Sequence, residues 1–118
     1  MPLRTFIYIT LFVLIAGCAT KSLAPEALDN GVRFSFLAPS ASSVSIAGSF
    51  NHWDPQTNAL TGPDRDGVWT TVLPLPPGRY EYRFVVNGKD WVLDPSVPSE
   101  DDGLGERNSL FVVEPSGK

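Results

Sequence analysis

The clearest alternation of apolar and polar positions in the chain lies in residues 79–86. Aromatic or aliphatic side chains occupy every second position there, and three of the four positions between them are charged. A period of two is typical of a β-strand with one buried face. The next two residues, Asn87 and Gly88, both tolerate positive φ and predict a tight hairpin turn. A returning strand is therefore expected over residues 90–93.

Shorter alternating runs predict strands at residues 32–37 and 43–47, and short apolar-rich runs predict two more at residues 68–73 and 108–113. The chain contains 11 prolines and 10 glycines, which favour many turns and short strands over long helices. No segment has a sustained helical period, although a short helix around residues 25–28 is compatible with Pro25 at its first turn. Residues 94–107 are expected to form a long acidic loop. The pattern predicts an all-β sandwich of about seven short strands.

The segment GSFNHWDP, residues 48–55, interrupts this pattern. Gly48 predicts a bulge or a sharp exit from a strand, because glycine tolerates backbone angles that other residues avoid. Phe50 is expected to turn inward, whereas Trp53 lies among polar residues typical of a surface loop. Trp53 is therefore either a plug for the edge of the core or a flat platform for a ligand. Trp69 lies within a strand and is expected in the core.

An apolar run near the N-terminus predicts a secretory signal peptide. It occupies residues 6–16 apart from Thr10, and it is shorter than the about 20 apolar residues of a membrane-spanning helix. The run ends in LIAGC, residues 14–18, which resembles a bacterial lipobox. That resemblance implies cleavage before Cys18 and lipid on its sulfur and its new N-terminus. We expect a signal peptide at residues 1–17, a lipidated cysteine and tether at 18–31, the β-sandwich at 32–114 and a tail at 115–118.

Lipid on Cys18 would tether the protein to a membrane, since each buried methylene contributes about 0.8 kcal/mol to membrane affinity. The resemblance implies a bacterial cell-envelope location, and Ala19 after the cysteine implies the outer membrane if the organism is Gram-negative. The alternative is an uncleaved signal anchor with an incidental buried cysteine. Cys18 is the only cysteine, so no intrachain disulfide is possible.

The charge balance argues against a nucleic-acid partner. The full chain has a formal net charge of −4, and removal of residues 1–17 with Arg4 leaves eight basic residues against 13 acidic ones, a balance of −5. Binding to nucleic acid depends on neutralising phosphates, and no cluster of lysines and arginines offsets the acidic excess.

Candidate catalytic groups are scarce. His52 is the only histidine, and the only cysteine belongs to the lipobox. Paired carboxylates occur in glycine-containing loops, where they are typical of solvated turns. The sequence EDDG, residues 100–103, offers oxygen ligands for a calcium ion but lacks the spacing of a full calcium loop. We therefore predict no enzyme activity, no metal and no cofactor.

Aromatic residues beside turns suggest a different chemistry. Trp91 follows the predicted hairpin directly, where a side chain can point outward. Sugar rings have an apolar C–H face that stacks on flat aromatic rings, and their hydroxyl groups need hydrogen-bond donors and acceptors. Trp53, Trp91, Arg83 and Asn108 would supply that set if the strands bring them together. The alternative is that the two tryptophans cap the two open ends of a small sandwich.

From residue 32 to residue 113 the chain resembles a carbohydrate-binding module of family 48, the glycogen-binding type. Such modules occur in the beta subunit of AMP-activated protein kinase and at the N-terminus of isoamylase-like and branching enzymes. The resemblance implies an immunoglobulin-like β-sandwich that binds α-glucan such as starch, maltodextrin or glycogen. The matching segments follow the order of the family: GSFNHW at 48–53, GVW at 67–69, LPPGRYEYRF at 75–84, VNG at 86–88, WVLDP at 91–95 and GERNS at 105–109.

The resemblance implies roles for single residues. Trp53 and Trp91 match two tryptophans that stack on the sugar, and Arg83 matches a lysine of the kinase subunit, with a planar fork in place of a point charge. Asn108 matches an asparagine that bonds sugar hydroxyls, and Leu104 matches a leucine that contacts the sugar.

Glu106 departs from the pattern, because the kinase module has a threonine at that position. Many modules of this fold bind no sugar and serve as structural supports. Two functions are therefore open. The first is a non-catalytic, lipid-anchored module for α-glucan. The second is a structural or protein–protein interaction sandwich of the cell envelope, whose tryptophans contact an envelope protein partner.

Overall fold

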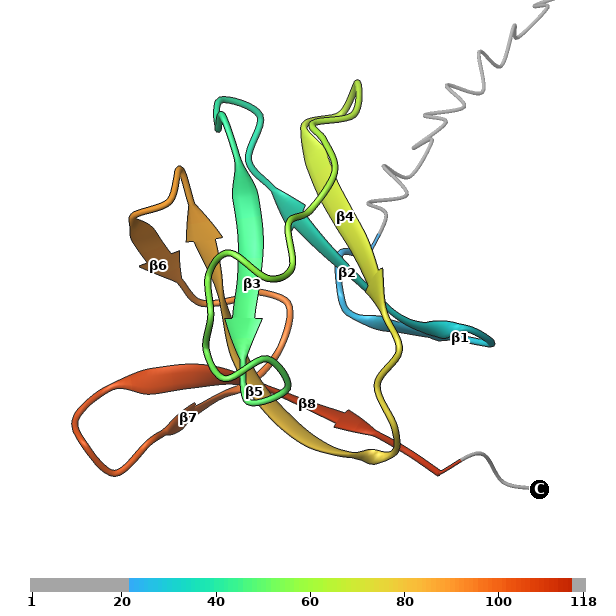
Figure 1. Ribbon diagram of the computed structural model, residues 1–118, viewed down its shortest axis with the longest axis vertical. Helices are drawn as coiled ribbons and strands as arrows, with labels where there is room; N and C mark the ends of the chain where they lie inside the picture. The colour runs from blue at the N-terminus through green and yellow to red at the C-terminus, as the bar shows by residue number, and fades with distance from the viewer. Residues whose placement is uncertain (1–21, 116–118) are drawn as a thin grey trace, which may run out of the picture.

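The computed structural model describes residues 22–115 (Figure 1), and every regular element in that range is a β-strand. The predicted signal peptide, the lipobox and Cys18 lie outside the described residues. No helix that is long and apolar enough to cross a membrane is found between residues 22 and 115. The strands are β1 Glu26–Leu28, β2 Gly31–Leu37, β3 Val44–Gly48, β4 Val68–Leu73, β5 Gly78–Val86, β6 Asp90–Val92, β7 Ser99–Asp101 and β8 Arg107–Val113.

The strands form two sheets, and every pairing within them is antiparallel. One sheet has the order β1-β2-β4, and the other has the order β3-β5-β8-β7, with β6 added to β5. In Figure 1, β2 and β4 lie together on one side of the domain, while β3 and β5 lie on the other. This arrangement confirms the predicted immunoglobulin-like β-sandwich.

Two short strands were not expected. β1 replaces the suggested helix at residues 25–28 and pairs with β2, so the sheet begins before the predicted boundary at residue 32. β7 lies within the segment expected to be a loop, and it pairs with β8. Each has three residues, which is too short for a period of two to be visible. Both form because a longer neighbouring strand offers free backbone groups.

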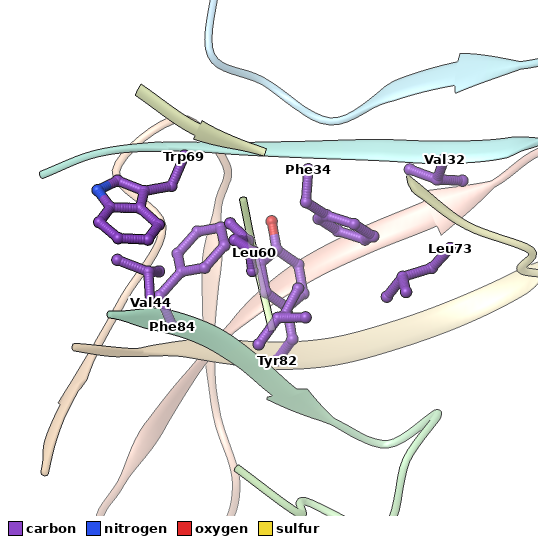
Figure 2. Close-up of a cluster of buried hydrophobic side chains, with 9 residues drawn as sticks. Val32, Phe34, Val44, Leu60, Trp69, Leu73, Tyr82 and Phe84 are labelled. Carbon is purple, nitrogen blue, oxygen red and sulfur yellow. The ribbon is translucent and has the colours of Figure 1, made fainter. Parts of the chain in front are cut away.

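The core lies between the sheets and consists mainly of β-branched and aromatic side chains (Figure 2). The ring of Phe34 packs edge-on against Tyr82, with ring centroids 5.0 Å apart. Trp69 is buried, as expected, and its Nε1 donates a hydrogen bond to the Ala38 carbonyl at 2.9 Å. The buried core residues are Val32, Phe34, Val44, Ile46, Leu60, Trp69, Leu73, Tyr82 and Phe84.

A buried polar contact fixes the chain after β6. The Tyr82 hydroxyl donates to Asp94 Oδ2 at 2.6 Å, and the Asp94 N–H donates to Ser109 Oγ at 2.8 Å. Tyr82 is fully buried and Asp94 is only 3% exposed. Burial raises the pKa of the Tyr82 hydroxyl well above its ordinary value, and the Asp94 carboxylate raises it further. The contact ties the segment that follows Trp91 to both β5 and β8.

Candidate functional site

An open groove of about 570 Å³ lies on the outer face of the five-stranded sheet. Alternation along β5 sends Tyr82 and Phe84 into the core and leaves Arg79, Glu81 and Arg83 facing the groove. The residues that line the groove are Trp53, Arg79, Glu81, Arg83, Trp91, Glu100, Asp101, Asp102, Glu106 and Asn108.

The groove brings together four of the five residues predicted to contact sugar. Leu104 is the exception, because it does not line the groove and is 87% exposed in the loop between β7 and β8. Trp53 and Trp91 lie in the same groove, so they do not cap opposite ends of the sandwich.

Trp53 is held on a turn with unusual backbone geometry. Both His52 and Trp53 have φ of 58°, a left-handed conformation that is uncommon for residues with bulky side chains. The Trp53 N–H donates to the Gly48 carbonyl at 2.9 Å, which closes the turn. Such conformations persist only where the surroundings over-determine them, and they are common at functional sites.

Asn51 holds this turn together, and the sequence analysis did not single it out. It is 7% exposed, and its Oδ1 accepts a hydrogen bond from the Gly48 N–H at 2.9 Å. Its Nδ2 donates to the Ile46 carbonyl at 2.9 Å and to Asn58 Oδ1 at 2.8 Å. A signal was available, because asparagine in a turn commonly bonds nearby backbone groups.

Gly48 is needed for a different reason from the one predicted. Its φ is not positive, and it is the last residue of β3. A Cβ at this position would lie 2.6 Å from both the Glu81 carbonyl oxygen and the Phe50 ring. Close packing, and not a special backbone angle, requires glycine here. Phe50 packs on the core as predicted, with its ring centroid 6.2 Å from that of Phe34.

Trp91 lies in β6, directly after the hairpin that Asn87 and Gly88 form with φ of 54° and 73°. The predicted turn is therefore confirmed. Trp91 pairs with Val85, and residues directly opposite in an antiparallel pair share one face of the sheet. Val85 is buried outside the core cluster, while Trp91 is 39% exposed. Trp91 thus offers an accessible ring on the outer face.

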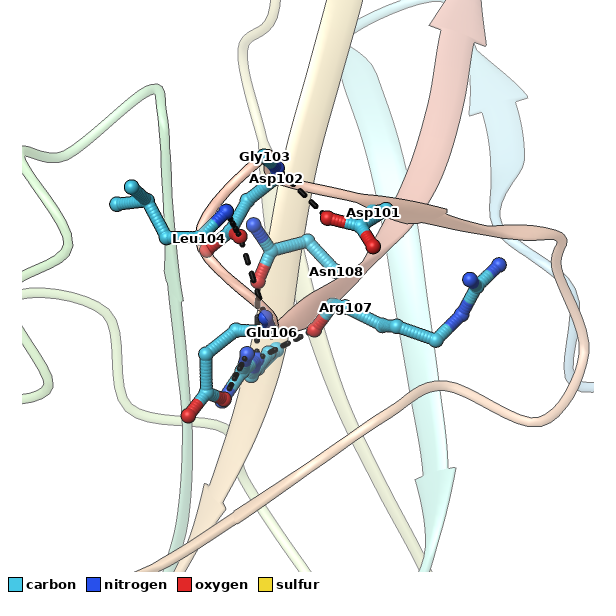
Figure 3. A network of polar contacts seen from close by, with 8 residues as sticks. Asp101, Asp102, Gly103, Leu104, Glu106, Arg107 and Asn108 are labelled. Carbon is cyan, nitrogen blue, oxygen red and sulfur yellow. Dashed lines mark hydrogen bonds and ion pairs between the residues drawn. The ribbon is translucent and has the colours of Figure 1, made fainter.

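Arg83 is occupied by neighbours in β8 and the loop before it. Figure 3 shows three of these neighbours, Glu106, Arg107 and Asn108. Its Nε donates to Asn108 Oδ1 and to the Arg107 carbonyl, both at 2.9 Å, and its Nη2 donates to Glu106 Oε2 at 2.8 Å. The Arg83 side chain is 17% exposed, against 65% for Glu106. Arg83 is thus not a free cation, and Glu106 is the residue that neutralises it.

Asn108 is only 7% exposed, and Arg83 fixes its orientation through Oδ1. Its Nδ2 group makes no hydrogen bond within residues 22–115. Every buried side-chain nitrogen in that range has a hydrogen-bond partner, so this group is not buried. The Nδ2 group therefore reaches solvent, on a residue that lines the groove. Asn108 offers an N–H donor there.

Asp101, at the end of β7, and Asp102, in the loop that follows, hold backbone amides of that loop. Asp101 Oδ1 accepts from the Gly103 N–H at 2.7 Å, and Asp102 Oδ1 accepts from the N–H groups of Leu104 at 2.7 Å and Glu106 at 3.2 Å. Within the described range no group of three or more His, Cys, Asp or Glu side chains could hold a metal ion. These contacts give the acidic loop a structural role and lend no support to the calcium site considered from the sequence.

The comparisons with known proteins agree with the fold. Residues 21–96 match the family Carbohydrate-binding module 48 (Isoamylase N-terminal domain). The chain is 32% identical over 80 residues to a 1,4-alpha-glucan branching enzyme of Rhizobium johnstonii. The aligned region covers 68% of this chain and 10% of the enzyme. It is 39% identical over 75 residues to Protein PTST, chloroplastic, of Arabidopsis thaliana, which covers 61% of this chain and 26% of that protein. With a family match over more than half of its length, this chain belongs to the carbohydrate-binding module 48 family.

Proposed function

We propose that the groove binds α-glucan chains, such as starch, maltodextrin or glycogen, without catalysing a reaction. The observation that carries the proposal is the meeting of Trp53 and Trp91, from separate loops and strands, in one groove that Asn108 also lines. Membership of a carbohydrate-binding family supports it. Similarity to a protein named 1,4-alpha-glucan branching enzyme supports it as well.

The chemistry of the groove fits a sugar chain. The two indole rings would stack on the C–H faces of sugar rings, and the Asn108 Nδ2 group would donate to a hydroxyl. Arg83 acts mainly by orienting Asn108, since three of its donor contacts are already made. Leu104 would contact a chain long enough to reach past the groove. A neutral hydrogen bond contributes only about 1 kcal/mol to the free energy of binding. Together with two stacked rings, this is compatible with dissociation constants from about micromolar to about millimolar.

Lipid anchoring through Cys18 is a further part of the proposal, and it rests on the LIAGC sequence at residues 14–18. The module would then be displayed on the bacterial cell envelope, at the outer membrane if the organism is Gram-negative. There it would meet glucan of dietary, environmental or envelope origin.

The test is a titration of the full chain, in a detergent without a sugar headgroup, with maltoheptaose and β-cyclodextrin. A saturable change in tryptophan fluorescence is expected with both ligands, and none with a cello-oligosaccharide. Calorimetry should show that Trp53→Ala and Trp91→Ala each weaken binding about 5-fold to about 150-fold, given the about 1–3 kcal/mol typical of one aromatic stacking contact. Leu37→Ala, an exposed apolar residue of the other sheet, is the matched control.

Thermal unfolding of the same variants separates the two roles of the tryptophans. Small changes in melting temperature with lost binding would support platforms for a ligand. A large loss of stability would instead make the tryptophans part of the packing. If no α-glucan binds at millimolar concentration, the proposal is wrong, and the tryptophans become candidates for a protein interface.

A further inference from the structure

The charge of the groove bears on which glycans it can accept. Five of the ten lining residues are carboxylates and two are arginines, which gives the lining a formal charge of −3. We call the five carboxylates the acidic rim. Its members are Glu81, Glu100, Asp101, Asp102 and Glu106.

Both arginines of the groove are already paired with the acidic rim. The Arg79 guanidinium forms an ion pair with Glu100 and lies 3.7 Å from a carboxylate oxygen of Glu81. Arg83 holds Glu106 at 2.8 Å. The Arg79 side chain is 50% exposed and that of Arg83 is 17% exposed, but neighbouring carboxylates already offset the charge of both, so neither is a free cation for an anionic ligand.

The remaining carboxylates face solvent and form no ion pair among the described residues. Arg107 is directly opposite Asp101 in the pairing of β7 with β8, but its guanidinium bonds Ser99 instead. Asp101 and Asp102 are exposed, and their described contacts are to backbone N–H groups of their own loop. Such contacts orient a carboxylate and leave its charge in place. The formal charge of the groove lining is therefore negative, which disfavours an anionic ligand and leaves a neutral polar one unaffected.

We propose, on the basis of the proposed glucan-binding function, that the groove selects uncharged glycan chains and rejects chains that carry phosphate, sulfate or carboxylate. The two tryptophan rings stack on any sugar ring, whereas the acidic rim repels rings that carry a negative charge. A phosphate monoester carries a charge of about −1.5 to −2 at neutral pH, so it is the strongest test ligand. Repulsion between exposed charges is screened as the Debye length falls from about 30 Å at 0.01 M salt to about 3 Å at 1 M.

The experiment compares maltoheptaose with phosphorylated maltoheptaose by calorimetry, using the full chain in a detergent without a sugar headgroup. O-acetylated maltoheptaose controls for the bulk of the substituent. At 0.01 M salt we expect the phosphorylated chain to bind at least about tenfold more weakly than the acetylated one, and at 1 M salt within about threefold.

Variants locate the source of the discrimination. The double substitution Asp101→Asn and Asp102→Asn keeps the oxygen acceptors for the loop amides and removes two charges. At 0.01 M salt, the ratio of the dissociation constant of phosphorylated maltoheptaose to that of acetylated maltoheptaose should therefore fall. Glu106→Gln should lower this ratio further, because it removes the carboxylate that neutralises the Arg83 guanidinium. Asp66→Asn removes an exposed carboxylate outside the groove lining and should leave the ratio unchanged.

The outcomes are distinct. Maltoheptaose binding with equal affinity for the phosphorylated chain at low salt would overturn charge selection and leave the glucan-binding function standing. A ratio that persists at 1 M salt would overturn it in favour of a steric cause. Absence of maltoheptaose binding at every salt concentration would overturn the glucan-binding function, and the charge selection with it.

Discussion

Tyr82 and Arg83 shape the groove by holding other residues in place. Tyr82 faces the core, but its hydroxyl holds Asp94, which follows the strand that carries Trp91. Arg83 in turn fixes the rotamer of Asn108. At this scale, the positions of Trp91 and Asn108, which we propose contact a ligand, depend on neighbouring buried or half-buried side chains.

Replacement of Tyr82 by phenylalanine leaves Asp94 Oδ2 without its donor. We expect a loss of about 1–3 kcal/mol in the free energy of unfolding at pH 7, because a buried carboxylate loses a hydrogen bond. Urea unfolding followed by circular dichroism would measure it. Ser96, which donates to the other carboxylate oxygen at 2.8 Å through its N–H, should limit the damage.

The wild type and the Tyr82→Phe variant should also differ in how their stability depends on pH. The pKa of Tyr82 is raised by burial first and by Asp94 second, so the unfolded chain releases this proton at a lower pH than the folded one. The stabilisation is complete below the ordinary tyrosine pKa of 10.0 and is lost as pH rises above it, by up to about 1.4 kcal/mol per pH unit. Between pH 9 and 11, wild type should lose stability faster than Tyr82→Phe. Parallel curves would contradict the assignment.

The turn at residues 48–55 is the element that decides where Trp53 lies. Three backbone hydrogen bonds close it, from the N–H groups of Asn51, Trp53 and Asp54. Asn51 adds three side-chain hydrogen bonds from a nearly buried position. The strained conformation of Trp53 is therefore supported by backbone hydrogen bonds of the turn and by the Asn51 side chain, which ties the turn to Ile46 and Asn58.

Asn51→Ala should destabilise the domain by about 2–3 kcal/mol, because it leaves the Gly48 N–H and the Ile46 carbonyl without these partners. It should also weaken glucan binding, since Trp53 loses its fixed orientation. Calorimetric titration with maltoheptaose, at a temperature where the variant is folded, measures the second effect.

Asn58→Ala is the matched control, because it removes only one of the three contacts of the Asn51 side chain. It should cost less stability and less affinity. Full-strength binding by a folded Asn51→Ala variant would show that the Trp53 platform does not need this support.

At the scale of the whole molecule, the groove lies on the outer face of the five-stranded sheet, and the core lies between the two sheets. Substitutions in the groove can therefore change recognition with little effect on the core. The described domain starts at residue 22, four positions after Cys18 in the sequence.

Cys18→Ser tests the proposed anchor. In a bacterial host with lipoprotein processing, wild type should incorporate labelled palmitate and partition into the detergent phase, and the variant should do neither. Glucan binding should be the same for both, because the described residues proposed to bind glucan all lie between positions 53 and 108 of the chain. Palmitate incorporation by the variant, or its absence from wild type, would contradict lipidation at this residue.

The amino-acid sequence by itself determined the fold class, most of the strands and the hairpin at Asn87 and Gly88. These features depend on local chemistry: alternation along β2, β3 and β5, and the ability of two adjacent residues to adopt positive φ. Sequence alone also identified Trp53, Trp91, Arg83 and Asn108 as one group, through the resemblance to a family.

Only the tertiary structure decided how those residues are used. Arg83 and Glu106 are 23 positions apart, and their ion pair exists because β5 and β8 are neighbours in one sheet. The three-residue strands β1 and β7 likewise form only against longer partners. Gly48 is required by the approach of Phe50 and the backbone of β5. Contacts between distant segments depend on packing in three dimensions, which a local pattern of apolar and polar residues does not contain.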